Sequence, residues 1–260
     1  MEHLGVFHNG GRPYCCGILK FVPTDSTFLP ERKLMKRKIL AATLGVVFTL
    51  AVAVLTLTVS IGLPIYVRPF YYLQIEPLGI PEATGHSYRE IVDSFNELLD
   101  YLTLPGREFS TGVFAYSEEG MNHFVDCKWL FDLNAVGLIV SLVIVVALLI
   151  LHKRGVITLP TLRGFRLSAI AGGALLLTFL ALGILVSLDF DRAFVIFHSL
   201  FFPGKDNWLF NPYTDEIILA LPSDFFMNCA ILIASSVIII SAGLLIRGIL
   251  IKKRASRRAS

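Results

Sequence analysis

The sequence predicts an all-α integral membrane protein in which four transmembrane helices carry a small extracellular cap. Hydrophobic residues make up 55% of the 260 residues and charged residues only 17%, a balance that excludes an ordinary soluble domain. Four apolar runs without a charged residue, at 39–67, 133–151, 167–188 and 225–246, have about the 20 residues that a span requires, or more. We expect the cap to combine an amphipathic helix with irregular or short-strand segments.

The four apolar runs divide the chain into consecutive segments. The expected segments are an N-terminal tail (1–34), a first span (35–67), an extracellular cap segment (68–132), a second span (133–152), a cytoplasmic loop (153–166), a third span (167–188), a second extracellular segment (189–224), a fourth span (225–251) and a basic cytoplasmic tail (252–260). The first run is longer than the apolar core of a secretory signal, so it reads as a retained anchor. Glycines and prolines break up the tail, which we expect to be poorly ordered or to lie upstream of a natural start at Met35.

The distribution of Lys and Arg predicts the orientation in the membrane. Basic residues cluster before the first run, between the second and third runs, and after the fourth, whereas acidic residues outnumber basic ones in 68–132 and 189–224. By the positive-inside rule both termini are cytoplasmic and the acidic segments face outward. The net charge of +3 is therefore a topology signal and indicates no nucleic-acid partner.

The first outer segment contains two helix starts. Ser87 and Glu90 have the spacing of a capping box, and apolar residues recur at helical spacing from Tyr88 to Leu102. Packing of this amphipathic helix inside the cap is favoured over a position on lipid headgroups. Residues 108–116 suit one or two short strands or an irregular crossing. Glu118 and Glu119 then open a helix that leads into the second span.

His123 and His198 are the most informative pair, because both fall just outside the same face of the membrane. Asp126 follows His123 by three residues, a spacing that allows it to orient the imidazole or to stabilise its protonated form. Cys127 is four residues after His123 and could meet it as a thiol and base pair, although a packing role is favoured. The cysteines show no disulfide framework.

Aromatic residues surround the second histidine along the chain. Phe190, Phe194, Phe197 or His198, and Phe201 recur at helical spacing, which predicts that the third span continues outward beyond its apolar core. A polar and aromatic loop follows this stripe. The candidate residues for a substrate pocket are Phe197, Phe201, Trp208, Tyr213 and Phe226, and the candidate supporting acids are Asp126, Asp206 and Asp215.

These residues resemble the signatures of the lipoprotein intramolecular transacylases (Lit) of Gram-positive bacteria. The first signature is His123 within Met-Asn-His-Phe-Val-Asp, and the second is Phe197-His198 with the Phe-Phe, Trp208, Asp215, Pro222 and Phe225-Phe226 that follow. The resemblance runs from Met35 to about Lys253. It implies an enzyme of the bacterial cell membrane with a four-helix fold, an extracellular cap, and catalytic histidines at positions 123 and 198.

The resemblance also implies a reaction and its partners. Such enzymes move the sn-2 acyl chain of a diacylglyceryl lipoprotein to the α-amine of its own N-terminal cysteine, which gives the lyso form. The expected partners are these lipoproteins and membrane lipid, and no cofactor is expected. One neutral His can remove the amine proton, while the other donates a hydrogen bond to the oxyanion or protonates the departing glyceryl oxygen. The sequence leaves open which histidine has which role.

Three alternatives remain open. A metal-dependent lipid hydrolase would draw ligands from His123, Asp126, His198, Asp206 and Asp215, although no His-Glu-x-x-His spacing supports it. A lipase that uses Ser199 is weaker, since no nucleophile elbow surrounds that serine. A non-catalytic four-span scaffold is the third alternative. Transport is disfavoured, because the four apolar runs contain no Asp, Glu, Lys or Arg.

Overall fold

The computed structural model describes residues 31–162 and 165–259. Most of the expected N-terminal tail, residues 1–30, lies outside this part of the chain. The contacts divide the chain between residues 38 and 39, and the architecture below is that of the unit 39–260. The elements in chain order are α1 (Glu31–Tyr66), α2 (Pro69–Tyr72), α3 (Ile80–Thr84), α4 (Tyr88–Thr103), α5 (Glu118–Lys153), β1 (Thr161–Leu162), β2 (Phe165–Arg166), α6 (Leu167–Leu188), α7 (Phe190–Phe201), α8 (Ile217–Ala220) and α9 (Ser223–Ala259).

Four of these helices, α1, α5, α6 and α9, are long and apolar enough to cross a membrane. The all-α class and the four spans predicted from the sequence are therefore confirmed. The strands β1 and β2 form one short antiparallel pair between α5 and α6. The strands considered for 108–116 are absent from that segment, which is an irregular crossing with a turn at Gly112.

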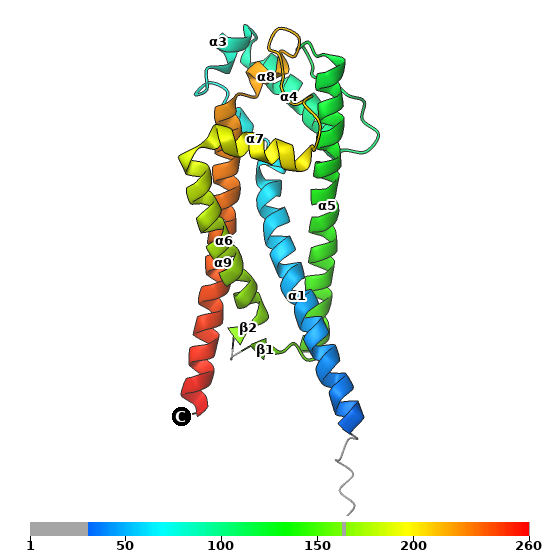
Figure 1. The fold of residues 1–260 in the computed structure, drawn as a ribbon, viewed down its shortest axis with the longest axis vertical. Helices are drawn as coiled ribbons and strands as arrows, with labels where there is room; N and C mark the ends of the chain where they lie inside the picture. Colours follow the sequence, from blue (N-terminus) through cyan, green and yellow to red (C-terminus); the bar gives the residue numbers. More distant parts are fainter. Residues whose placement is uncertain (1–30, 163–164, 260) are drawn as a thin grey trace, which may run out of the picture. The chain divides into compact units, whose positions relative to one another are not determined.

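Small residues let the spanning helices approach closely. A Cβ atom added to Gly172 of α6 would lie 2.7 Å from the carbonyl oxygen of Ser241 in α9, and one added to Gly248 would lie 2.2 Å from the Cβ of Ala169. Figure 1 shows α6 and α9 running side by side. Because lipid tails are as apolar as the helices, close packing of this kind drives helix association in a bilayer.

A hydrophobic core holds the cap together and joins its two chain segments. Tyr71 of α2 is 1% exposed and stacks on Phe95 of α4 with ring centroids 3.8 Å apart. Its hydroxyl donates a 2.8 Å hydrogen bond to the carbonyl oxygen of Ala220 in α8, and its ring meets the edge of Phe225 at 5.2 Å. The segment before α5 and the segment before α9 therefore share one core.

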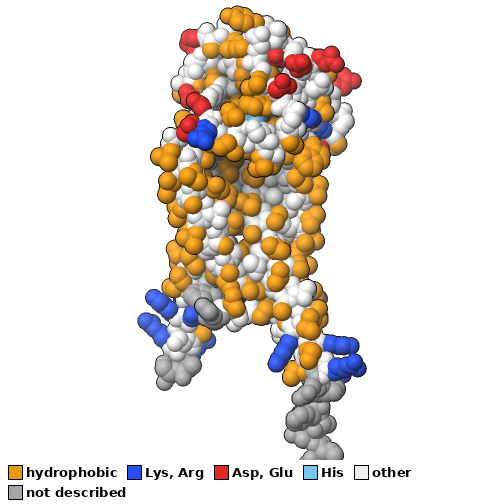
Figure 2. Space-filling view, viewed as in Figure 1, with side chains coloured by type: hydrophobic (Ala, Val, Ile, Leu, Met, Phe, Trp, Pro, Cys, Tyr) orange, Lys and Arg blue, Asp and Glu red, His pale blue; other side chains and the backbone are white. Residues whose placement is uncertain are grey.

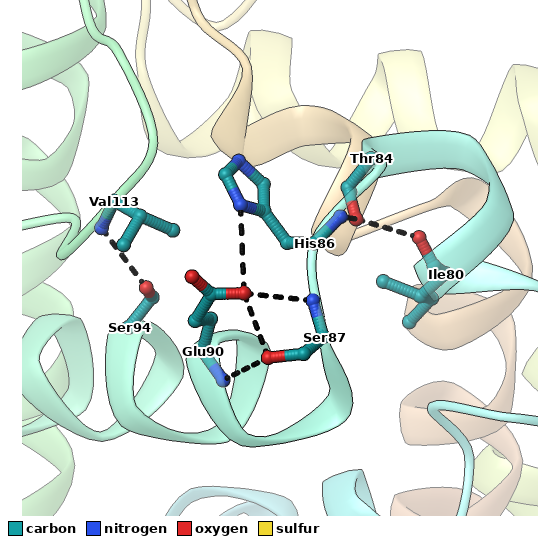
Figure 3. Close-up of polar contacts among 7 residues, drawn as sticks. All are labelled: Ile80, Thr84, His86, Ser87, Glu90, Ser94 and Val113. Atoms are coloured by element: carbon teal, nitrogen blue, oxygen red, sulfur yellow. Dashed lines mark hydrogen bonds and ion pairs between the residues drawn. The ribbon is translucent and has the colours of Figure 1, made fainter.

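The start of α4 confirms the predicted capping box. Figure 3 shows the carboxylate of Glu90 accepting hydrogen bonds from the backbone nitrogen of Ser87 at 2.8 Å and from its hydroxyl at 2.7 Å. The Ser87 hydroxyl accepts in turn from the backbone nitrogen of Glu90, and these contacts keep the pKa of Glu90 below its ordinary value. The apolar face of α4 is buried in the cap core, as expected, with Ile91 0% exposed.

The long helix α5 connects the cap to the membrane. It begins at Glu118, as predicted, with Ser117 as the N-cap. Its 36 residues extend about 54 Å, which is longer than the ~30 Å hydrocarbon core, and its uncharged run starts only at Leu133. The first turns of α5 therefore belong to the cap. In Figure 2 acidic side chains gather over the cap, and apolar side chains cover the spanning part below it.

The region after α6 differs from the sequence prediction. The third span does not continue outward as one helix, because Asp189 leaves the helical conformation with φ −160° and ψ 90°. Its side chain accepts a 2.9 Å hydrogen bond from the backbone nitrogen of Arg192 and so caps a separate helix, α7. Figure 1 shows α7 crossing from the end of α6 towards α5. The aromatic stripe therefore lies on a helix that crosses the end of the bundle.

The shared cap core leads to a stability prediction. Tyr71→Phe removes the hydrogen bond to Ala220 and leaves a buried carbonyl oxygen without its donor, so we expect a loss of about 1–3 kcal/mol in the free energy of unfolding. Tyr88→Phe removes a hydroxyl from a residue that is 43% exposed and should cost less than about 0.5 kcal/mol. Denaturant unfolding of the purified proteins in detergent measures both. Equal stabilities of the two variants would contradict this account.

Candidate active site

The two histidines predicted as a pair come together beneath the cap. His123 lies in the second turn of α5 and is 5% exposed, and His198 lies in the last turns of α7 and is 7% exposed. Their ring centroids are 5.8 Å apart with an interplanar angle of 34°. This separation is that of two rings in direct contact.

Aromatic rings enclose both histidines. His198 packs on Phe194 at 4.2 Å and stacks on Trp208 at 4.6 Å between centroids. His123 meets Phe202 at 4.9 Å and Phe210 at 5.5 Å. The pair therefore sits in surroundings that disfavour charge on either ring.

The protonation of His198 follows from its hydrogen bond. Its Nδ1 lies 2.8 Å from the carbonyl oxygen of Phe194. A carbonyl can only accept, so Nδ1 carries the proton and Nε2 of the neutral ring is the acceptor. Burial lowers the pKa of His198 below its ordinary value, against the opposing effect of this hydrogen bond. At neutral pH we therefore expect the His198 ring to be uncharged, with Nε2 as its acceptor atom.

His123 has a sulfur partner at one nitrogen. Its Nε2 lies 3.3 Å from the Sγ of Cys127, so the thiol and imidazole pair weighed from the sequence is present in the structure. Its Nδ1 is buried without a hydrogen bond of normal geometry. The side chain of Asn207 interacts with this imidazole, and the Oδ1 of Asn207 is also buried without a hydrogen bond. The side chains of Asn207 and His123 therefore pair with each other through a contact outside normal hydrogen-bond geometry.

Asp126 reaches the site through other residues. Its Oδ1 accepts from the Nζ of Lys205 at 2.5 Å, and its Oδ2 accepts from the Nδ2 of Asn207 at 3.2 Å. It makes no hydrogen bond to His123 among the described contacts. Asp206, the second supporting acid, is exposed on a shallow hollow of about 420 Å³ that Asp126 and Asn207 also line.

Asp215 holds the beginning of α5. It is 4% exposed and accepts hydrogen bonds from the backbone nitrogen of Ser117 at 2.8 Å, from the Ser117 hydroxyl at 2.7 Å and from Thr214 at 2.8 Å. Burial raises the pKa of Asp215, but these hydrogen bonds outweigh it and keep the pKa below its ordinary value. A Cβ on Gly120 would lie 2.1 Å from Asp215 Oδ1, so this approach requires glycine.

The predicted pocket aromatics are placed unequally. Trp208 stacks on His198, Phe197 packs beside it at 5.4 Å, and Phe201 packs on Phe197 at 4.7 Å. Phe226 reaches the site only through Phe194, at 5.6 Å. Tyr213 is 93% exposed and lines a different hollow with Phe114 and Pro212, so the structure does not bring it to the histidines.

Sequence reasoning missed some of the residues that enclose the pair. Phe202, the C-cap of α7, follows His198 by four residues, so helical spacing could have identified it. Phe210 and Asn207 lie in a loop, where no periodic signal exists.

The alternative chemistries find little support in the geometry. Within 31–162 and 165–259, no group of three or more His, Cys, Asp or Glu side chains is arranged to hold a metal ion. The carboxylates of Asp126 and Asp215 are occupied by other donors, as described above. Ser199 is exposed and donates to the carbonyl oxygen of Val195 in its own helix, so no base activates it.

Comparisons with known proteins agree with this architecture. The family described as lipoprotein intramolecular transacylase Lit matches residues 46–226. The fold is similar to a crystal structure of Lit from Bacillus cereus, with a TM-score of 0.74 and 24% identity over 86% of this chain and all of that one. The fold is also similar to two variants of that protein in which one histidine is replaced. The arginine variant has a TM-score of 0.70 and 22% identity over 88% of this chain and 99% of that one. The alanine variant has a TM-score of 0.70 and 23% identity over 88% of this chain and all of that one.

No curated protein sequence matches the chain. The family match covers well over half of the residues, including both histidines. The described residues include four helices long and apolar enough to span a membrane. This chain is an integral membrane protein that belongs to the lipoprotein intramolecular transacylase family.

Proposed function

We propose that this protein moves the sn-2 acyl chain of a diacylglyceryl lipoprotein to the α-amine of that lipoprotein's N-terminal cysteine. The observation that carries the proposal is the buried pair of neutral imidazoles 5.8 Å apart at the end of the spanning helices. Family membership supports the substrate class. An acyl migration within one substrate needs neither a protein nucleophile nor a cofactor, because the amine and the ester are already in one molecule.

The hydrogen bonds suggest different roles for the two histidines. His198 is the general base, because the Phe194 carbonyl fixes its proton on Nδ1 and leaves Nε2 free to accept. Burial raises the pKa of the Cys127 thiol, so we assign the thiol as the donor and Nε2 of His123 as the acceptor in their contact. His123 then carries its own proton on Nδ1. It acts as the donor to the oxyanion that develops on the ester carbonyl.

The reaction balances without a further reactant. The amine nitrogen attacks the ester carbonyl carbon, and His198 Nε2 accepts one amine proton. The carbonyl oxygen takes the negative charge and is stabilised by the Nδ1 proton of His123. When the tetrahedral intermediate collapses, the bond between carbonyl carbon and glyceryl oxygen breaks, and His198 returns the proton to that oxygen. The products are an amide and a free glyceryl hydroxyl, and the enzyme is unchanged.

The exposed face of α7 supports access from the lipid. Its exposed apolar residues are Val195 (47%), Ile196 (58%), Phe197 (48%), Leu200 (71%) and Phe201 (45%). His198 points from the same helix into the protein. A short helix with one apolar exposed face and one buried face suits the membrane interface, where an ester in the outer leaflet would lie. The aromatic enclosure would keep out water, which would otherwise hydrolyse that ester.

We also propose that the cap faces outward and that both termini are cytoplasmic. Acidic side chains dominate the cap, whereas basic residues follow α5 and fill the end of α9. This asymmetry follows the positive-inside rule. The active site then faces the compartment in which the lipoprotein is anchored.

Substitution of either histidine tests the reaction. We expect His123→Ala and His198→Ala to lower the rate of acyl migration by at least about 100-fold, because each removes one proton-transfer or oxyanion group. His86→Ala should retain the rate, because His86 lies in the cap against Phe114 and Glu90. Tandem mass spectrometry of a diacylglyceryl lipopeptide distinguishes amide-linked from ester-linked acyl chains. Normal migration in both site variants would favour the scaffold alternative.

The pH dependence tests the role of His198. The base and the substrate amine must both be neutral, so the logarithm of the rate should rise with a slope of about 2 below the His198 pKa and of about 1 above it, up to the amine pKa near 8. Because burial lowers the His198 pKa, the break should fall below the ordinary value of about 6.5. The residual activity of His198→Ala should show a slope of about 1 throughout. A break above 6.5 in the parent protein would contradict the assignment.

The proposed orientation can be tested by labelling in intact cells. Tyr213→Cys places a thiol on the exposed surface of the cap, and Arg254→Cys places one near the end of α9. A membrane-impermeant maleimide should label the first without lysis and the second only after lysis. The reverse pattern would invert the topology.

A further inference from the structure

A polar hollow of about 420 Å³ lies beside His123, between the first turns of α5 and the loop after α7. Its lining includes Asn122 and Asp126 of α5, and Lys205, Asp206 and Asn207 of the loop. Asn122 precedes His123 in the chain, and the side chain of Asn207 contacts the His123 imidazole. The hollow and the proposed site therefore share a wall.

The hollow lies on the polar side of the membrane boundary. The uncharged run of the second span begins at Leu133, so Asp126 lies about 10 Å further out along the helix. Both Asn122 and Asp206 are exposed. The exposed face of α7, in contrast, is apolar and suits the acyl chains. A lipid chain and a water-soluble chain thus meet different surfaces around the histidines.

The groups that line the hollow suit a peptide better than a phosphate. The amide of Asn122 makes no hydrogen bond among the described residues, and it offers the donor and the acceptor that a peptide backbone requires. The ammonium of Lys205 is engaged by Asp126. The carboxylate of Asp206 has no partner in the described part of the chain. One unbalanced negative charge remains, which repels anions and attracts cations.

The substrate of the proposed reaction contains a part that needs such a place. Its N-terminal cysteine has to bring the amine and the ester to the histidines, while the polypeptide that follows this cysteine has to continue into water. The hollow is open to water and adjoins His123. Its volume of about 420 Å³ is within the range of about 300–1,000 Å³ that ligand sites usually have.

We propose that the hollow holds the peptide segment that follows the acylated cysteine, and that the carboxylate of Asp206 makes the protein favour substrates with basic residues in this segment. The inference rests on the proposed function, since the occupant is part of the substrate of that reaction. The ion pair between Lys205 and Asp126 adds no net charge, so Asp206 sets the sign of the preference. Exposed charges interact weakly and are screened by salt, so the preference is modest and falls as ionic strength rises.

Two synthetic lipopeptides measure this preference. Both contain diacylglyceryl-cysteine with a free N-terminus, and they differ only in whether the residues directly after the cysteine are lysine or glutamate. The purified protein, in a nonionic detergent, is assayed for the kcat/KM of amide formation by mass spectrometry. Dissociation constants are measured with the N-acetylated forms, which lack the attacking amine. We expect the lysine peptide to be favoured about threefold to tenfold in both quantities at low salt, and the ratio to approach one at about 1 M salt.

Charge variants test whether the preference arises in the hollow. Asp206→Asn removes the free charge and should bring the ratio close to one, and Asp206→Lys should reverse the preference. Glu82→Lys makes the same change in net charge on α3, where Glu82 is exposed and lines no part of the hollow, so it should keep the ratio of the parent protein. Every variant receives the same peptides, so any effect of lysine or glutamate on the pKa of the substrate amine cancels in the comparison.

The outcomes separate the two proposals. If the parent protein forms no amide from either peptide, the proposed function fails, and the dissociation constants still decide the inference. A ratio near one in the parent protein, or the same ratio in Asp206→Lys, would overturn the inference and leave the reaction intact. A shift in Glu82→Lys as large as that in Asp206→Lys would assign the preference to the whole acidic cap and would also overturn it. If Asp206→Lys does not fold, Asp206→Asn decides, because an unchanged ratio in that variant contradicts the role of this carboxylate.

Discussion

The hydrogen bonds between Asp215 and Ser117 are the constraint on which the site depends. The histidines belong to helices that are distant in the chain, and neither helix alone fixes their separation. Asp215 lies in the loop that follows α7, and it binds the N-cap of α5 shortly before His123. Gly120 makes this approach possible, since any side chain there would collide with the carboxylate. The loop that leaves His198 is thus fastened to the helix that carries His123.

The cap core extends this constraint to the rest of the outer part. Tyr71 joins α2 to α8 through its hydroxyl, and its ring packs between α4 and the start of α9. Rings and aliphatic side chains thereby tie both outer segments to the ends of the spanning helices. Glycines at the contact of α6 and α9 serve the same purpose inside the bilayer. The imidazole pair consequently lies between the cap core and the packed spanning helices, and it belongs to neither.

The lengths of the spans and the starts of the helices were predictable, because short stretches of sequence determine them. Span lengths follow from bilayer thickness, and the capping box at Ser87 and the start of α5 at Glu118 follow from the needs of a helix end. The pairing of His123 with His198 was suggested by topology, because both fall on one side of the membrane, and by the resemblance to the transacylases. Its geometry was not predictable. Asp189 ends one helix and caps the next, and periodicity cannot distinguish that break from a continuous helix. Tyr213 and Asn207 occupy one loop, and only the folded path of that loop places Tyr213 in solvent and Asn207 beside His123.

A membrane acyltransferase of this kind must admit a lipid and exclude water at the same place. Helix α7 meets both demands because its two faces point in different directions. Phe197 and Phe201 are exposed on the outer face, whereas His198 is buried on the inner face. An acyl chain that approaches along the apolar face displaces only lipid, so opening a path for it does not open a path for water. Inside, the rings of Phe194, Phe202 and Trp208 leave the histidines neutral and poorly hydrated. In the proposed reaction a neutral base would suffice, because proximity of the tethered amine to the ester replaces the strong nucleophile that an intermolecular transfer would require.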